Sequence, residues 1–197
     1  MVQRSLSEKG DTAAQILEVA QELVQLRGFN AVSYSDISRR LGIRNASVHY
    51  HFPAKTDLGV ALVRRYRERL EAQLAAISSR GLPLPERLDA YLLAYRDVVR
   101  PDGRICLCTV LANDFNTLPG AMQAEVGQFF DLNRRWLAAA LAEGQASGEL
   151  TLTQPPEQAA SALLAGLEGA MLLARASGDT AQFEPLARLL LGQFRAA

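Results

Sequence analysis

The sequence predicts an all-α protein in which a small N-terminal helix-turn-helix precedes a larger helical domain. Alanine and leucine dominate the 197 residues, and apolar side chains recur at helical spacing with no stretch that alternates like a strand. The stretch RGLPLP at residues 80–85 is the clearest break in this pattern. We therefore expect three parts: residues 1–54, a connecting helix over residues 55–80, and residues 81–197.

Capping residues and glycines define the first two helices. Asp11 and Thr12 can cap a first helix that ends at Gly28. A short second helix is expected to begin after Ser35 and to stop at Gly42. The apolar face of the first helix comprises Ile16, Ala20, Leu23 and Val24, and that of the second comprises Ile37 and Leu41.

The next two helices are separated by a proline. Asn45 is a plausible N-cap for a short third helix that runs to Phe52, where Pro53 prevents its continuation. A long fourth helix is expected from Lys55 to Ser79. Its apolar stripe comprises Leu58, Leu62, Tyr66 and Leu70.

Beyond the break, glycine and proline again divide the chain into helical segments. The expected segments are residues 86–100, 104–117, 121–147, 156–177 and 181–194.

The formal net charge is zero, but the charges are unevenly distributed along the chain. Residues 1–80 hold 12 Lys and Arg against 8 Asp and Glu, whereas residues 81–197 hold 9 against 13. Within residues 34–56, four basic side chains face a single acidic one. Because binding to phosphate depends on local charge, the N-terminal part is the candidate for nucleic-acid binding.

The composition argues against a disulfide framework, a metal site and a membrane span. Cys106 and Cys108 cannot complete a zinc shell alone, and the two histidines lie far from them in the sequence. We therefore expect no cofactor and no metal. The most apolar stretch, residues 159–174, contains Glu168 and is short for a bilayer, and no secretion signal opens the chain. We expect a cytoplasmic protein without membrane contact.

The segment around Gly42 has the spacing of a helix-turn-helix, whose second helix lies in the major groove of DNA. Val48 and Phe52, four residues apart, would anchor that helix to the core. Its outward side chains can bond to bases, and the basic residues at either end can hold phosphates. The candidate DNA-contacting residues are Arg44, Asn45, Ser47, His49, Tyr50, His51 and Lys55. Taken singly, each fits a structural role at least as well, so the prediction depends on the whole string.

Residues 12–58 resemble the DNA-binding domain of the TetR family. The string ILEVAQELVQLRGFNAVSYSDISRRLGI resembles its first two helices, and NASVHYHFPAKTDL resembles its recognition helix and the Phe-x-x-Lys-x-x-Leu signature. His49 stands where the family usually has Tyr, and Arg44 where Ser or Thr often caps the helix. The resemblance implies that Ser47, Tyr50 and Lys55 touch double-stranded operator DNA, and that the second half binds a small-molecule inducer and forms a homodimer.

The last two helices are the candidate dimer interface, because a symmetric DNA site requires a symmetric dimer. They carry more apolar residues than a helix with one solvent-exposed side needs. Gly166, Gly169 and Ala170 would permit close approach of another helix. The candidate interface residues are Leu164, Leu167, Met171, Leu186, Leu190 and Phe194. The alternative is that these residues fill the core of a single chain.

The inducer pocket is expected among aromatic and sulfur-bearing residues of the second half, because ligand sites are mostly apolar with a few polar groups. The candidates are Tyr91, Tyr95, Cys106, Cys108, Phe115, Phe129, Trp136 and Glu168. Ordinary core packing explains the same residues almost as well.

The string GRICLCTVLANDFNTLPGAM resembles the sixth helix of a TetR subgroup with a Cys-Leu-Cys core. The resemblance implies, as one alternative, a response to reactive electrophiles, which some members of that subgroup show. Cys106 is expected in the first turn of a helix beginning near residues 102–103, beside Arg104, and both features favour the thiolate. Alternatively, Cys106 is an inert buried side chain and the inducer binds reversibly, as a small apolar or weakly acidic molecule.

We therefore expect a non-enzymatic repressor that leaves its operator when a ligand in the second half moves the fourth helix. Ligand and operator would then weaken each other's binding by the same factor. Two other classes of protein stay open at this point. One is an enzyme whose active site lies in the second half, although the sequence shows no persuasive nucleophile–base pair. The other is an interaction module that dimerises without binding DNA.

Overall fold

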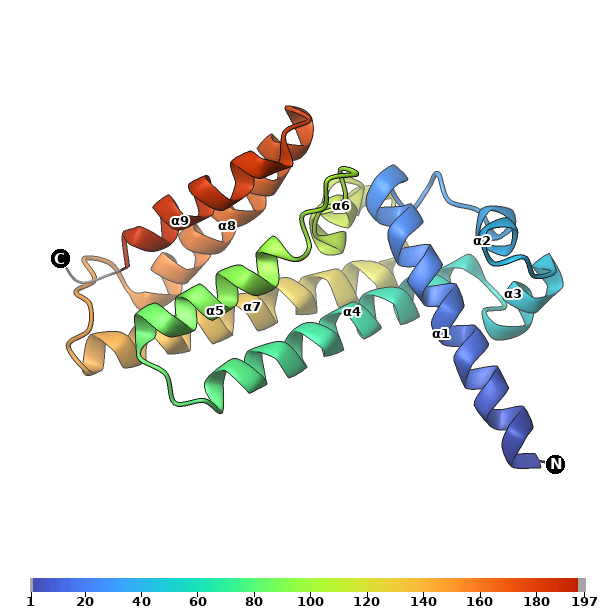
Figure 1. Cartoon of the computed structure of the whole chain (residues 1–197), viewed down its shortest axis with the longest axis horizontal. Helices are drawn as coiled ribbons and strands as arrows, with labels where there is room; N and C mark the ends of the chain where they lie inside the picture. Colours follow the sequence, from blue (N-terminus) through green and yellow to red (C-terminus); the bar gives the residue numbers. More distant parts are fainter. Residues whose placement is uncertain (1, 195–197) are drawn as a thin grey trace.

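The computed structural model describes residues 2–194, with side chains described from Asp11 to Phe194, and it is all-helical over that range. An N-terminal head contains α1 (Val2–Arg27), α2 (Tyr34–Leu41) and α3 (Asn45–His51). The body contains α4 (Lys55–Ser78), α5 (Leu84–Arg96), α6 (Leu107–Asn113), α7 (Gly120–Ala146), α8 (Pro156–Ala176) and α9 (Phe183–Gly192). Two short 3₁₀ helices, η1 (Phe115–Thr117) and η2 (Thr180–Gln182), follow α6 and α8. The predicted all-α class is confirmed (Figure 1).

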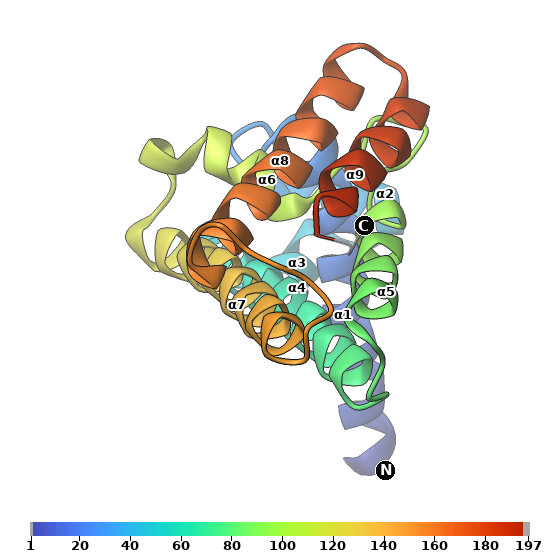
Figure 2. The ribbon, with the colours of Figure 1, turned by 90° about the vertical axis from the view of Figure 1, so that its left-hand side faces the viewer.

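The body is a layered bundle in which α7 is central. It packs against α4 on one side and α8 on the other, and α9 pairs with α8 and also reaches α5. Figure 2, which looks along the bundle, shows α8 and α9 together at its outer edge. The head packs on one end of the bundle, where α1 contacts both α4 and α6 (Figure 1).

Several helix ends differ from the predicted ones. Helix α1 extends upstream of Asp11 to Val2, so Asp11 and Thr12 lie inside the helix and do not cap it. Helix α2 begins at Tyr34 because Ser33 forms a capping box with Asp36, in which each residue's backbone N–H donates to the other's side chain. The end of α2 is as expected: Gly42 adopts a left-handed conformation, with φ 68°, that suits glycine.

The sequence suggested that Asn45 caps α3, and this prediction is wrong. Asn45 is its first helical residue, and Arg44 takes the cap position without a side-chain hydrogen bond. The expected helix over residues 104–117 is also wrong in extent, since α6 begins at Leu107 and ends at Asn113 before η1. The last predicted helix is divided in the same way, into η2 and α9.

Helix α8 is long and apolar enough to cross a membrane by length and composition, contrary to the sequence argument that this stretch is too short. Half of its most apolar window is nevertheless buried inside the protein. Leu163, Leu167 and Met171 face inward, where α8 packs against α7 and α9. This burial is typical of a core helix in a soluble bundle.

Candidate functional sites

The first candidate site is the outer face of α3. Val48 is fully buried and Phe52 is 8% exposed, so these two residues anchor α3 to the head as the sequence predicts. The Tyr34 hydroxyl donates to the Phe52 carbonyl oxygen at 2.7 Å, which fixes the end of α3 against the start of α2. The Tyr34 ring also contacts the edge of His49, with ring centroids 4.6 Å apart. The orientation of α3 is therefore set by buried contacts on one side, which leaves its other side available.

The residues predicted to contact DNA gather around this outer face. Arg44, Asn45, His49 and Tyr50 are exposed, with Tyr50 65% exposed, whereas Ser47 and His51 are half-buried. The rings of Tyr50 and His51 meet edge-on at 5.3 Å, which orders two of these polar groups relative to each other. The face thus presents several donors and acceptors on one short helix, which is the arrangement that a base-reading helix needs.

Lys55, at the start of α4, is already held by the head. Its Nζ donates to the Asn30 carbonyl oxygen at 3.3 Å and lies 4.7 Å from the centre of the Phe29 ring. Partial burial lowers the pKa of this ammonium group. An ammonium has three donors, so Lys55 can still give a hydrogen bond to a phosphate while its contact with Asn30 is kept.

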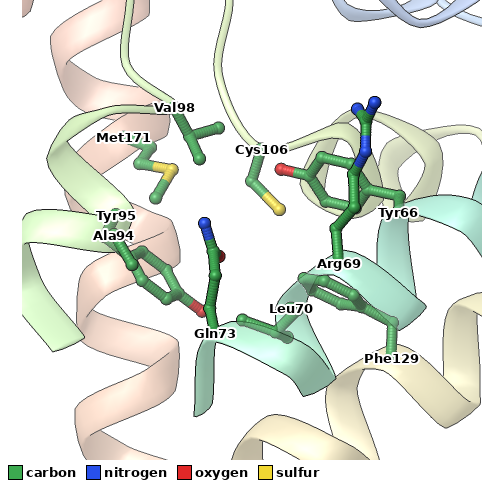
Figure 3. A pocket seen from close by; sticks show the side chains of 10 residues that line it. All are labelled: Tyr66, Arg69, Leu70, Gln73, Ala94, Tyr95, Val98, Cys106, Phe129 and Met171. Atoms are coloured by element: carbon green, nitrogen blue, oxygen red, sulfur yellow. The ribbon is translucent and has the colours of Figure 1, made fainter. Parts of the chain in front are cut away.

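The second candidate site is a cavity of about 120 Å³ in the body. Val98 and Cys106, which bracket the segment between α5 and α6, both line it. Most of its walls are apolar (Figure 3). The full lining comprises Tyr66, Arg69, Leu70, Gln73, Ala94, Tyr95, Val98, Cys106, Phe129 and Met171.

The polar groups of the cavity are mostly uncharged. Figure 3 shows the Gln73 amide reaching into the middle of the cavity and the Tyr66 hydroxyl turned toward Cys106. The charged exception is Arg69, whose guanidinium lies 3.4 Å from Gln21 Oε1 and 3.4 Å from Glu18 Oε2 on α1. The cavity therefore offers an apolar space with a few neutral hydrogen-bonding groups and one cation at its edge.

A buried polar network lies behind the Tyr95 wall. The hydroxyls of Tyr91 and Tyr95 lie 2.9 and 3.3 Å from Asn133 Oδ1, and Tyr95 also lies 3.1 Å from Glu168 Oε1. The Thr109 hydroxyl donates to the other Glu168 oxygen. Burial raises the pKa of Glu168 to about 7, an increase that the bonds from Thr109 and Tyr95 reduce. The network joins α5, α6, α7 and α8 at one point.

Cys106 is not the activated thiol that the sequence suggested. It precedes α6, and Arg104 turns away to bond Asp102 and Glu22. Burial raises the pKa of Cys106 to about 12, and the neighbouring Glu168 adds to this increase. Cys108 is fully buried, and burial likewise raises its pKa well above the ordinary value. Both cysteines are therefore neutral thiols in this conformation.

The structure brings only some of the predicted pocket residues to the cavity. Tyr95, Cys106 and Phe129 line it, and Tyr91 and Glu168 belong to the network behind it. The remaining candidates do not line it: Trp136 stacks on Tyr91 and bonds Ser78, Cys108 lies in the core, and Phe115 is exposed on η1. Sequence reasoning missed Arg69 and Gln73 on α4, together with Asn133, a fully buried amide on α7.

The predicted interface residues divide into two groups: four are buried, whereas Leu186 is 37% exposed and Leu190 is half-buried against the core. Leu164, Leu167, Met171 and Phe194 are buried within the single chain, so they fill its core and are not open to a partner. The reason is that α8 is apolar on both sides. Gly166 serves the same internal packing, because an added Cβ would lie 2.9 Å from Leu190 of α9. The exposed apolar side chains of these two helices are Leu172, Leu173, Leu186 and Leu189.

Among the residues whose side chains are described, no three His, Cys, Asp or Glu side chains gather as metal ligands would.

Comparison with known proteins places the whole chain in one family. Residues 16–62 match the model for bacterial regulatory proteins of the tetR family, and residues 85–190 match the model for a tetracyclin repressor-like C-terminal domain. The transcriptional regulator AcuR of Cereibacter sphaeroides is 26% identical over 163 residues, which are 81% of this chain and 74% of AcuR. The HTH-type transcriptional repressor NemR of Escherichia coli is 26% identical over 183 residues, 91% and 90% of the two chains.

A solved structure agrees with these matches. The crystal structure of a TetR-family transcriptional regulator from Agrobacterium tumefaciens superposes with a TM-score of 0.90 and 38% identity, covering 95% of this chain and 100% of that one. The matched segments include α3 and, of the helices around the cavity, α5, α7 and α8; the part of α4 that lines the cavity, residues 66–73, lies between them. This chain therefore belongs to the TetR family of DNA-binding transcriptional regulators.

Proposed function

We propose that this protein is a homodimeric repressor that releases a palindromic operator when a small inducer occupies the cavity of the body. The observation that carries the proposal is the combination, in one chain, of an outward polar helix fixed by buried contacts and a mostly apolar cavity. Family membership supports both halves of this description. The protein would work in the cytoplasm, where the operator is.

The dimer would form through the exposed leucines of α8 and α9. Leu173 and Leu189 are 64% and 68% exposed, and exposed large apolar side chains gathered on two paired helices favour an interface. Gly169 adds a small position on α8, since a Cβ there would meet nothing within 4 Å. The dimer would present one α3 of each subunit to successive major grooves, about 34–36 Å apart, or at another separation that matches the operator.

The cavity favours a small inducer that binds reversibly. Its volume of about 120 Å³ is somewhat below that of an engineered cavity that holds benzene, so it suits a ligand of a few heavy atoms. Arg69 could hold an acidic group at the edge, and Tyr66 or Gln73 could bond a neutral one. The raised pKa of Cys106 makes a thiol-reactive inducer the second choice, because the thiolate is the reactive form.

The test of DNA binding is a titration of the purified protein into the DNA upstream of its own gene, at two salt concentrations, with a scrambled duplex as control. Several phosphate contacts per dimer predict a steep loss of affinity with salt. Tyr50→Ala should weaken specific binding by about tenfold or more while leaving folding intact, because this side chain is largely exposed. Arg135→Ala, on the exposed side of α7, is the matched control. A folded dimer that binds neither duplex would contradict the proposal.

A further inference from the structure

A buried hydrogen bond joins the head to the wall of the cavity. Gln25, on α1, is only 4% exposed, and its Nε2 donates to the carbonyl oxygen of Ile105 at 2.6 Å. Ile105 is fully buried and immediately precedes Cys106, which lines the cavity. The bond thus connects residues 80 positions apart in the sequence, at the place where Figure 1 shows α6 beside the end of α1.

The acceptor of this bond belongs to a segment that the cavity touches at both ends. Val98 and Cys106 both line the cavity, and the chain between them folds back on itself. Within it, the Arg100 N–H donates to the Arg104 carbonyl oxygen at 2.9 Å, and the Gly103 N–H donates to the Arg100 carbonyl oxygen at 2.9 Å. A segment closed by its own hydrogen bonds tends to move as a unit, so an occupant that displaces Val98 or Cys106 also displaces the carbonyl of Ile105.

Other contacts between α1 and the body are less suited to transmit such a displacement. Glu18 pairs with Arg65 at 2.6 Å and Glu22 pairs with Arg104 at 3.1 Å, but the two carboxylates are 58% and 39% exposed. Arg69, which lines the cavity, also lies 3.4 Å from Glu18 and from Gln21, but its side chain is 45% exposed. Exposed pairs of this kind contribute little, and long side chains can follow a moving partner. Gln25 is only 4% exposed, and leaving so buried an amide unpaired is costly, which favours movement of the helix that carries it.

We infer that Gln25 is the positioning residue through which occupancy of the cavity reorients the head, by way of its hydrogen bond to the Ile105 carbonyl. The inference rests on the proposed function, and it assigns transmission to α1 in addition to α4. Movement of α1 carries α2 and α3, because α1 packs against both. Occupancy therefore changes the separation of the two α3 helices in a dimer, and with it the affinity for the operator.

The test fills the cavity by mutation, so that no inducer has to be known. Ala94→Leu adds three carbon atoms to the cavity wall on α5, and Val98→Phe is a second filler in case the first does not fold. Each filler is combined with Gln25→Leu in a double-mutant cycle. Affinity is measured by fluorescence anisotropy for a duplex selected by the wild-type protein from a random library, and circular dichroism melts confirm folding.

In the wild-type background the filler should weaken operator binding by about tenfold or more. In the Gln25→Leu background the same filler should have an effect of less than about threefold, because the link to Ile105 is absent. A merely structural role for Gln25 would lower stability and baseline affinity but leave the effect of the filler unchanged, and that result would overturn the inference.

The control is Glu22→Gln, which removes the exposed pairs that the same helix makes with Arg104 and with Arg40 of α2, and which should leave the filler effect intact. If the filler loses its effect on operator affinity in both Gln25→Leu and Glu22→Gln, transmission belongs to the whole contact between α1 and the body, and the specific role of Gln25 is overturned. If no duplex is selected, or if neither filler changes affinity in the wild-type background, the proposed function itself fails. The two failures are distinguishable, because the filler in the wild-type background tests the proposed function and the filler in the Gln25→Leu background tests the role of Gln25.

Discussion

The buried carboxyl of Glu168 should make the stability of the protein depend on pH across the neutral range. Its pKa is about 7 in the folded chain, against an ordinary value of 4.5, because burial disfavours the charged form. Between these two values the folded protein holds a proton that the unfolded chain has lost. The free energy of unfolding therefore falls as pH rises through this window, and it levels off above the folded pKa.

The size of the effect follows from the two pKa values. Each pKa unit of difference corresponds to 1.36 kcal/mol, so linkage gives a loss of about 2.5 kcal/mol between pH 5 and pH 8. Glu168→Gln should remove this contribution, because the amide resembles the protonated acid: its carbonyl oxygen can accept from one of the two hydroxyls of Thr109 and Tyr95, and its NH2 group can donate to the other, as the O–H of the acid does. The variant should be more stable than the wild type at pH 8, and the difference should shrink toward pH 5.

The assay is urea unfolding followed by circular dichroism at several pH values, at one fixed protein concentration because the protein is proposed to dimerise. The informative quantity is the difference between wild type and variant, in which the other titrating groups cancel. Glu157→Gln, on the exposed start of the same helix, controls for the removal of one carboxylate from α8. Parallel pH profiles for wild type and Glu168→Gln would refute the reasoning.

Three further predictions concern the interface, the packing of α4 and the cysteines. Leu173→Glu combined with Leu189→Glu should weaken dimerisation by at least about tenfold in sedimentation experiments, whereas Leu93→Glu, an exposed leucine on α5, should not. Gly59→Ala should lower the free energy of unfolding by about 1–3 kcal/mol, because an added Cβ would crowd side chains of α7 and of the head; unchanged urea midpoints would contradict this. Cys106 should react with a disulfide reagent at neutral pH at least about 100-fold more slowly in the native protein than in urea, and equal rates would contradict its raised pKa.

The helix ends that the sequence predicted correctly are those fixed by local chemistry. Gly28 and Gly42 end their helices with positive φ, at 80° and 68°, as glycine readily does. The start of α1 was missed because Asp11 and Thr12 are capping residue types that also occur within helices, so the signal for a cap was not specific. The start of α2 was misplaced by two residues for a similar reason, since Ser33 and Ser35 offer the same hydroxyl and only the pairing with Asp36 distinguishes them.

The start of α6 depends on tertiary structure, which a local pattern does not contain. Residues 104–106 precede the helix, and the carbonyl of Ile105 accepts from Gln25 on α1. That partner lies far away in the sequence, so no spacing rule could reveal it. The same holds for the cavity: Arg69 and Gln73 lie on α4 at positions that the helical pattern marks only as polar, and their position at the cavity depends on where α5 and α6 pack. The family, the class of fold and the regulatory function were nevertheless predictable, because the string around α3 is specific.

Helix α8 shows why the division between core and interface was the hardest part to predict. Apolar side chains surround most of this helix, so periodicity does not distinguish the face that packs on α7 from the face that looks outward. The structure separates the two faces: Leu167 and Met171 point inward, whereas Leu173 points outward. Glu168 lies on the inner side, bonded to α5 and α6, and Met171 lines the cavity one turn away. An occupant of the cavity therefore touches the same helix that is proposed to form the dimer, which gives it a further route, besides α4 and α1, to the spacing of the recognition helices.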